Sequence, residues 1–566
     1  MAGETDRLAS AAGLVLGLAV ALPLGAGFFG TVLPALGWFP VLGAHSFSSA
    51  PLRAFLAMPG VMQAVMLSFG TGLIATFLSL IASFTLIVAV SSRMPVQRLR
   101  AIMGPLIAVP HSTIAIAILF LLAPSGWLMR LVSPELTGFM RPPASGLLPD
   151  LEFHGLIIAL LAKEIPFLCL VSMAALATRP ASQLAAIGRS LGYTHGAAMW
   201  LLVMPDIYRL IRLPLAAVLV FSVSVVDMPL VLGPGLPPPL AVLVLQGFED
   251  PDLLARLPAS AGALLQVGLA ILALVIWRIG EICVAWLLRG WRRRGRRTRL
   301  PAAIGHMVSG LACLPVLAGL FGLIAACLWA FTTRWFFPDA LPGRIDVTAL
   351  LRAESLLPAL GGSFVIGGAG TILATVLCLL VLQSGLVARV GPALHSMICI
   401  PLLLPQISIV TGLQMMLLWT HLDGTWLAMI WMHMLFILPY VWLIMAPAHA
   451  ALDQRFNRVA ATLGKRRLYR FRKVTLPLLM PAVTTVLFLG MSVSVALYLP
   501  SLFAGAGRIT TITTEAVALA AGGSRQMAGL AAMLQLAIPL VTFVCLQAWF
   551  RRRFEKFAGM RGGGLH

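Results

Sequence analysis

The sequence predicts an all-α integral membrane protein in which twelve transmembrane helices form two parallel six-helix halves. Three observations predict this fold: the composition, the number of long apolar runs and an internal repeat. Hydrophobic residues make up 60% of the 566 residues and charged residues only 10%, and the mean hydropathy is +0.98. A soluble protein of this length would need far more polar surface to cover its domains. Lipid is therefore expected to contact much of the exterior.

Twelve apolar runs are long enough to cross a hydrocarbon core about 30 Å thick. Each is predicted to be a helix, because every unpaired backbone group in lipid costs several kcal/mol. The predicted spans are 8–30, 62–90, 101–123, 154–177, 213–233, 260–288, 303–331, 358–384, 394–419, 426–450, 476–500 and 526–550. The first run follows a mixed-charge N-terminus without a convincing cleavage site, so it is interpreted as a membrane helix and not as a signal peptide.

The charges between the spans are distributed unequally. With twelve spans, both termini and every even-numbered loop lie on one side, where the segments hold 29 of the 40 Lys+Arg but only 5 of the 19 Asp+Glu. The opposite loops hold 9 basic and 11 acidic residues. The basic excess predicts that the first side, with the N- and C-termini, is cytoplasmic. The basic run at 291–302 is then a cytoplasmic linker beside acidic lipid headgroups, and nucleic acid is not an expected partner.

An internal repeat supports the division into halves. Four short segments of the first half recur in the same order in the second, at offsets of 269–273 residues, or 295 for the earliest pair. One of them ends at Pro110 and its copy ends at Pro405 (405 − 110 = 295), and another begins at Ser222 and recurs from Ser492. Each half has six spans, an even number, so the copies share one orientation and a pseudo-two-fold axis along the membrane normal is expected. The predicted halves are 1–290 and 303–566, with a shared pathway between them.

A regular loop joins the fourth and fifth spans of each half. A glycine and a proline stand thirteen residues apart in both copies. The residues that define the pattern are Leu191, Gly192 and Pro205 in the first half, and Arg458, Ala460, Ala461, Leu463, Gly464 and Pro477 in the second. Glycine permits the positive φ that ends a short helix, small residues permit close approach, and proline suits the first turn of the next helix. The pattern predicts a short helix presented to a partner.

The second loop resembles the EAA signature, E-A-A-x-x-L-G followed by I-x-L-P, of permeases from binding-protein-dependent ABC importers. The first loop is a degenerate copy, and Arg458 stands where the signature has glutamate. In that family the loop forms a coupling helix that docks on the ATPase. Two fused halves are similar to the duplicated permeases of iron(III) and thiamine importers and to YnjC-type permeases. The resemblance implies a bacterial inner-membrane permease that binds two copies of a cytoplasmic ATPase and receives a small solute from a periplasmic binding protein.

Several chemical functions are not supported by the sequence. It contains no G-x-x-x-x-G-K-[ST] phosphate-binding loop, so ATP and Mg²⁺ are expected in the ATPase partner, and this chain is expected to hold no cofactor and no catalytic residue. Its 7 cysteines are scattered through apolar runs without a C-x-x-C pair. That distribution predicts neither a disulfide framework nor a metal site.

Ionisable residues within spans are candidate functional residues, because each costs about 2.5–3.5 kcal/mol at a helix centre on insertion scales. Asp227 lies in the fifth span, which the resemblance assigns to the pathway; a partly wet position at the outer end is the equal alternative. Glu164, beside Lys163, is expected more often to stabilise the fold through a partner on another helix. His433 lies on a Met-rich helix and is expected to be packed rather than bound to a ligand. These three residues are the candidates for the translocation path.

The sequence thus predicts a non-enzymatic permease subunit of an ATP-driven importer, whose substrate is set by the binding protein. The alternative is an ion-coupled secondary transporter with parallel six-helix repeats. A membrane-embedded enzyme would need His, Asp and Glu clustered at one depth, which the sequence does not show.

Overall fold

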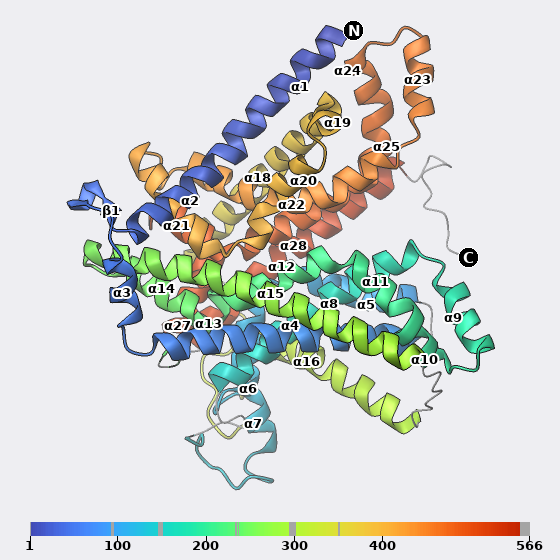
Figure 1. Cartoon of the computed structure of the whole chain (residues 1–566). Coiled ribbons are helices and arrows are strands. Elements are labelled where there is room, and N and C mark those ends of the chain that lie inside the picture. Colours follow the sequence, from blue (N-terminus) through green and yellow to red (C-terminus); the bar gives the residue numbers. More distant parts are fainter. Residues whose placement is uncertain are drawn as a thin grey trace.

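The computed structural model describes residues 2–91, 96–144, 151–232, 235, 237–293, 302–348, 351 and 353–554. The regular structure of this part is helical, apart from one antiparallel pair of two-residue strands, β1 Trp38–Phe39 and β2 Ala44–His45 (Figure 1). The predicted all-α fold is confirmed. Residues 294–301 of the predicted basic linker lie outside the described residues.

The predicted number of membrane spans agrees with the structure. In the described part, 10 helices are long and apolar enough to cross a membrane, or up to 12 if each of two bent pairs is one span. The helices of residues 1–290 are α1 (Ala2–Leu16), continued by η1 (Gly17–Ala21) and α2 (Leu22–Ala35), then α4 (Val61–Ser91), α6 (His111–Leu122), α8 (Leu156–Ala177), α12 (Arg212–Ser224) and α15 (Arg256–Arg293). Those of the second half are α16 (Ala302–Ala330), α18 (Leu357–Ser384), α21 (Gln406–Trp419), α22 (Trp426–Ala450), α25 (Leu476–Ala496) and α28 (Arg525–Phe554).

The third and fifth spans of each half are broken, whereas the sequence predicted continuous helices. The segments before or after these breaks are α5 (Val96–Ile107), α13 (Asp227–Leu232), α20 (Pro392–Leu403) and α26 (Tyr498–Gly505). Pro110 and Pro405 explain two breaks, because proline lacks an N–H and disfavours helix at the residue before it. At the other two, Val225 and Leu497 have extended ψ values of 139° and 94°. Hydropathy does not detect such breaks, because the apolar composition continues across them.

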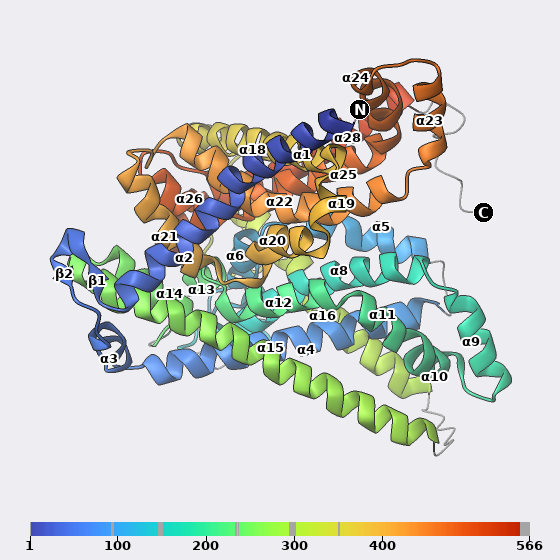
Figure 2. The ribbon, with the colours of Figure 1, turned by 45° about the horizontal axis from the view of Figure 1, so that its top comes forward.

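The first helix of each half packs against the other half. Figures 1 and 2 show α1 and α2 lying across the helices of the second half, and α2 packs against α21 as well as α15. In the same way α16 packs against α6 and α8. Small residues make both crossings close: a Cβ at Gly30 would lie 2.8 Å from the Gly412 oxygen, and one at Gly322 would lie 2.5 Å from the Ala117 oxygen. Glycine and alanine allow such close approach of helix backbones.

Corresponding hydrogen bonds occur in the two halves. A short apolar helix precedes the sixth span in each, α14 (Leu240–Glu249) and α27 (Ile512–Ala521). The first N–H of each of these helices donates to a serine on the second span: Leu240 to Ser68 and Ile512 to Ser363, both at 2.8 Å. The buried amide of Gln266 donates to Val223 O at 3.1 Å, and that of Gln535 donates to Val495 O at 3.3 Å.

These contacts correct one detail of the sequence repeat. Val223 and Val495 differ by 495 − 223 = 272 residues, the same offset as Pro205 and Pro477 (477 − 205 = 272). The match from Ser222 to Ser492 differs by 270 and is therefore two residues out of register. A run of alternating serine and valine can be matched in more than one register, so only the contacts fix it.

Candidate functional site

The two regular loops lie at the same end of the molecule. Helices α9 (Ala181–Ser190) and α23 (Gln454–Thr462) occupy that end in both views, with the start of α1 (Figures 1 and 2). Gly192 and Gly464 follow these helices with φ of 86° and 69°, the left-handed conformation expected for helix-ending glycines. The next N–H closes each turn, from Tyr193 to Gly188 O and from Lys465 to Ala460 O, both at 3.1 Å. Both loops therefore end in a Schellman motif.

The two prolines lie inside helices and not at a helix start, which corrects the sequence interpretation. Each follows a π-helical turn, η4 (Met199–Val203) before Pro205 and η7 (Phe471–Thr475) before Pro477. The helices have already begun at α10 (His195–Ala198) and α24 (Arg467–Arg470). In a π-turn the backbone hydrogen bonds join residues five apart and not four apart. The α-helical hydrogen bond that proline would interrupt is therefore not made there. Both loops therefore have a π-turn at the same place between the glycine and the proline.

The two short helices pack differently on the body. In the first loop Ala185 and Val203 are buried, and a Cβ at Gly188 would lie 2.5 Å from the Ala198 Cβ. In the second loop the positions equivalent to Ala185 and Val203 are Asn457 and Thr475, whose side chains are joined by a hydrogen bond of 3.3 Å. Helix α9 is thus seated by apolar packing and α23 by a polar contact.

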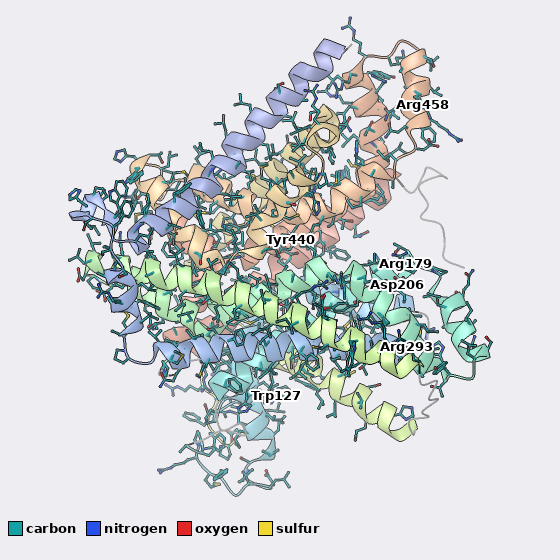
Figure 3. The ribbon with its side chains drawn as sticks, in the orientation of Figure 1. Trp127, Arg179, Asp206, Arg293, Tyr440 and Arg458 are labelled. Atoms are coloured by element: carbon teal, nitrogen blue, oxygen red, sulfur yellow. The ribbon has the colours of Figure 1, made fainter. Side chains whose placement is uncertain are left out.

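Both helices present apolar side chains to solvent. Phe456, Val459 and Leu463 are 57%, 59% and 68% exposed, and their i, i+3, i+7 spacing places them on one face of α23. Ile187 and Leu191, at the positions equivalent to Val459 and Leu463, are each 53% exposed. Arg458 and Ala461 are exposed beside this face, and Figure 3 shows Arg458 on the outer side of α23. An apolar stripe on an exposed helix is typical of a docking surface.

A second candidate site lies where the broken spans resume. The first residue after each of the four breaks is polar or ionisable: His111 on α6, Asp227 on α13, Gln406 on α21 and Tyr498 on α26. Asp227, Gln406 and Tyr498 line one small cavity of about 20 Å³, and His111 is close enough to interact electrostatically with Asp227. The breaks therefore bring four polar side chains from both halves of the sequence together in an apolar interior.

Asp227 is the most constrained member of this group, which we call the break cluster. It is 6% exposed, and among the described residues its Oδ2 atom has no hydrogen-bond partner. The backbone N–H groups of Asp227 and Met228 lie against the same carboxylate. A buried carboxylate oxygen without a partner costs free energy, so its retention calls for a functional explanation.

Glu164 extends the break cluster through His111. The His111 Nε2 and Glu164 Oε1 atoms are 3.8 Å apart, and the His111 ring lies 4.4 Å from that of Phe221. Tyr440, near the middle of the molecule in Figure 3, also interacts electrostatically with Glu164. The structure thus places two of the predicted path residues, Glu164 and Asp227, next to the same histidine.

Lys163, the neighbour of Glu164, has a separate role. Its ammonium group donates to Ile107 O at 2.8 Å and to Val109 O, at the break between α5 and α6. These carbonyl groups lost their helical partners where the span is interrupted. Lys163 therefore finds its partners outside its own helix, at this break.

His433 does not join the break cluster. Its Nδ1 atom lies 2.7 Å from Ser494 Oγ and its Nε2 atom lies 3.1 Å from Ser501 Oγ. Both ring nitrogens are therefore occupied within the second half, and the residue is buried. This geometry agrees with the expectation that His433 is packed.

Sequence reasoning missed His111, Gln406 and Tyr498. The available signal was a proline followed by a polar residue inside an apolar run, as in Pro110-His111 and Pro405-Gln406. Among the described residues, no group of three or more His, Cys, Asp or Glu side chains is placed to hold a metal ion.

Comparison with known proteins gives one extensive similarity and two partial ones. Residues 385–556 match the family model described as "Binding-protein-dependent transport system inner membrane component". The chain is 32% identical to the inner membrane ABC transporter permease protein YnjC of Escherichia coli K12, over 87% of this chain and 88% of that protein. It is 27% identical to the putrescine transport system permease protein PotI of the same strain, over 39% of this chain and 78% of that protein. The PotI protein of Escherichia coli O6:H1 gives the same figures.

Proposed function

The chain belongs to the inner-membrane ABC transporter permeases, and we propose that it forms the whole transmembrane pathway of an ATP-driven importer. Permease components of this family serve binding-protein-dependent transport and are not themselves enzymes. This chain is a multi-pass inner-membrane protein of that kind. Its halves, residues 1–290 and 303–566, together take the place of two separate permease subunits.

The pathway runs between the halves, at the break cluster. Corresponding serine and glutamine hydrogen bonds in the two halves support this arrangement, because each fixes a short helix or a break in the same way. Interrupted membrane helices expose polar groups where a solute is bound or passed, which continuous helices do not. Asp227 and Glu164 face the pathway, and His433 stabilises the wall of the second half.

The two loops couple this pathway to two copies of a cytoplasmic ATPase. The observation that carries the proposal is the pair of Schellman-capped helices, α9 and α23, at one end of the molecule with exposed apolar faces. In the second loop Arg458, Ala460, Ala461, Leu463 and Gly464 form the contact, with Pro477 behind it. In the first, Leu191 and Gly192 form the contact, with Pro205 behind it. ATP and Mg²⁺ bind to the ATPase, and this chain supplies no cofactor.

The loop end is cytoplasmic in this proposal, with both termini, as the excess of basic residues there predicts. A periplasmic binding protein delivers a small solute at the opposite end. The ATPase closes around ATP and moves α9 and α23, and this motion opens the halves alternately to the two sides.

Purification of the chain with its ATPase tests the proposal. We expect an intact membrane complex with two ATPase copies per chain, measured by native mass spectrometry. ATP hydrolysis by the complex should rise when the binding protein is added with its solute. Transport by the chain alone in proteoliposomes, driven by a proton gradient, would refute the proposal and support an ion-coupled secondary transporter.

A further inference from the structure

We propose that Asp227, with Tyr498 and Gln406, binds the positively charged group of the transported solute, so that the substrate is a small organic cation. This inference rests on the proposed function, because it takes the break cluster as part of the pathway. It goes further by assigning a substrate class and the side chains that recognise it.

The geometry places one unsatisfied anionic atom against a cavity. Asp227 Oδ2 has no hydrogen-bond partner among the described residues, and Asp227 lines the cavity with Tyr498 and Gln406. The cavity is about 20 Å³, enough for roughly one water molecule. A larger ligand therefore requires the halves to separate, as alternating access demands.

The local charges favour a cation over an anion. The Lys163 ammonium lies beside Glu164 and donates to two backbone carbonyls, so it balances Glu164 and not Asp227. His111 interacts with Asp227 and lies 3.8 Å from Glu164, so one ring is shared between two carboxylates. The Asp227 Oδ2 atom has no partner of its own among the described residues, and a buried carboxylate oxygen without a partner is costly. A cation supplied by the solute would satisfy it.

The surrounding side chains favour an organic cation over a metal ion. Phe221 and Tyr498 contribute aromatic rings to the cavity, and aromatic faces attract organic ammonium groups. The Gln406 amide oxygen is a neutral acceptor for an N–H donor. A hard metal ion would instead need several oxygen or nitrogen ligands at one point. The described residues provide no group of three or more His, Cys, Asp or Glu placed for that.

The effect of reagent charge on cysteine modification tests this assignment. Ser224 lines the cavity and is buried, so Ser224→Cys provides a reporter beside Asp227. The full chain is produced with its ATPase in membranes, with the exposed Cys283, Cys327 and Cys545 replaced by serine. Modification rates are measured with methanethiosulfonate ethylammonium, a cation, and methanethiosulfonate ethylsulfonate, an anion. Each modification rate is divided by the rate at which the same reagent reacts with free 2-mercaptoethanol.

We expect the cation to react at least about tenfold faster than the anion, which is the ratio expected for opposite charges about 6 Å from a carboxylate at the dielectric constant of water, about 80. Asp227→Asn should abolish this preference. The matched control is Asp206→Asn, which removes a carboxylate paired with Arg179 at 3.3 Å. This pair lies close to α9 in Figure 3, and its loss should leave the preference for the cation unchanged. Methylammonium chloride should slow modification more than sodium chloride or magnesium chloride at equal ionic strength.

Each other result overturns the inference. Equal rates or an anion preference would exclude a cation site, and a preference that survives Asp227→Asn would exclude Asp227. An unreactive reporter during ATP turnover would place the cavity outside the pathway. Stronger protection by magnesium than by methylammonium would exclude the organic cation. Copurification of the ATPase is measured independently, so the inference can fail while the proposed function stands.

Discussion

The crossing of α2 with α21 allows a quantitative prediction about how the halves are held together. A Cβ at Gly30 would lie 2.8 Å from the Gly412 carbonyl oxygen and 2.9 Å from its Cα, both backbone atoms that cannot rotate away. Gly25, on the same helix, has nothing within 4 Å of such a Cβ. Gly30→Ala therefore forces the two helices apart, whereas Gly25→Ala does not.

The expected magnitude follows from these two environments. Overpacking a close contact costs typically about 1–3 kcal/mol. Alanine is favoured over glycine in a helix by about 0.8–1 kcal/mol, and this gain is common to both variants. The free energy of unfolding of the Gly30→Ala variant should therefore be about 1–3 kcal/mol lower than that of the Gly25→Ala variant. Gly412→Ala should be at least as destabilising as Gly30→Ala, because its Cβ would overlap the Gly27 carbonyl oxygen.

Reversible unfolding in mixed micelles, titrated with sodium dodecyl sulfate, measures the difference. The loss of helical circular dichroism gives the midpoint for each variant under identical lipid and detergent conditions. Equal midpoints for Gly30→Ala and Gly25→Ala would refute the argument, since they would mean that α2 does not approach α21 closely in the membrane.

Three further predictions concern the loops, the topology and the helix break. Gly464→Val should uncouple ATP hydrolysis from transport more severely than Gly192→Val, because the second loop keeps the fuller signature. Stimulation of ATPase activity by the binding protein measures this defect. A larger defect in Gly192→Val would reverse the ranking. A cysteine at Asp250 should react with an impermeant maleimide from outside intact cells, and one at Arg293 only after permeabilisation; the opposite pattern at either site would mean that the span count is wrong. Lys163→Met should destabilise the chain by about 2 kcal/mol or more, because it leaves two buried carbonyls without their donor. The same unfolding titration in mixed micelles measures this. An unchanged unfolding midpoint would show that water replaces the ammonium group.

Sequence reasoning reached the fold class and the two loops because both depend on local chemistry. Membrane helices are determined by apolar runs, and the glycine turns at Gly192 and Gly464 are required by positive φ. The break cluster was reached only through its ionisable residues, Asp227 and Glu164. His111 and Gln406 are polar residues next to prolines, and nothing in the sequence says that two breaks 295 residues apart (406 − 111) meet in space.

Packing between the halves could not be predicted for the same reason. Gly30 and Gly412 are separated by most of the chain, and glycine is common throughout it, with 52 in all. Neither position has a local pattern that identifies its neighbour. The contact exists because the first helix of each half lies on the other half, a feature of tertiary packing that hydropathy does not encode.

The break cluster also bears on why one gene would encode both halves. Two identical subunits around an axis must place the same residue at both equivalent positions, so any change to the site appears twice. In this chain the equivalent positions differ: His111 corresponds to Gln406, and Asp227, at the offset of 272 residues, corresponds to Leu499. Fusion lets mutation alter one wall of the passage while the other stays as it was. The pathway can then bind a solute with two different ends in one orientation. A strictly symmetric dimer would bind the same solute equally well in both orientations.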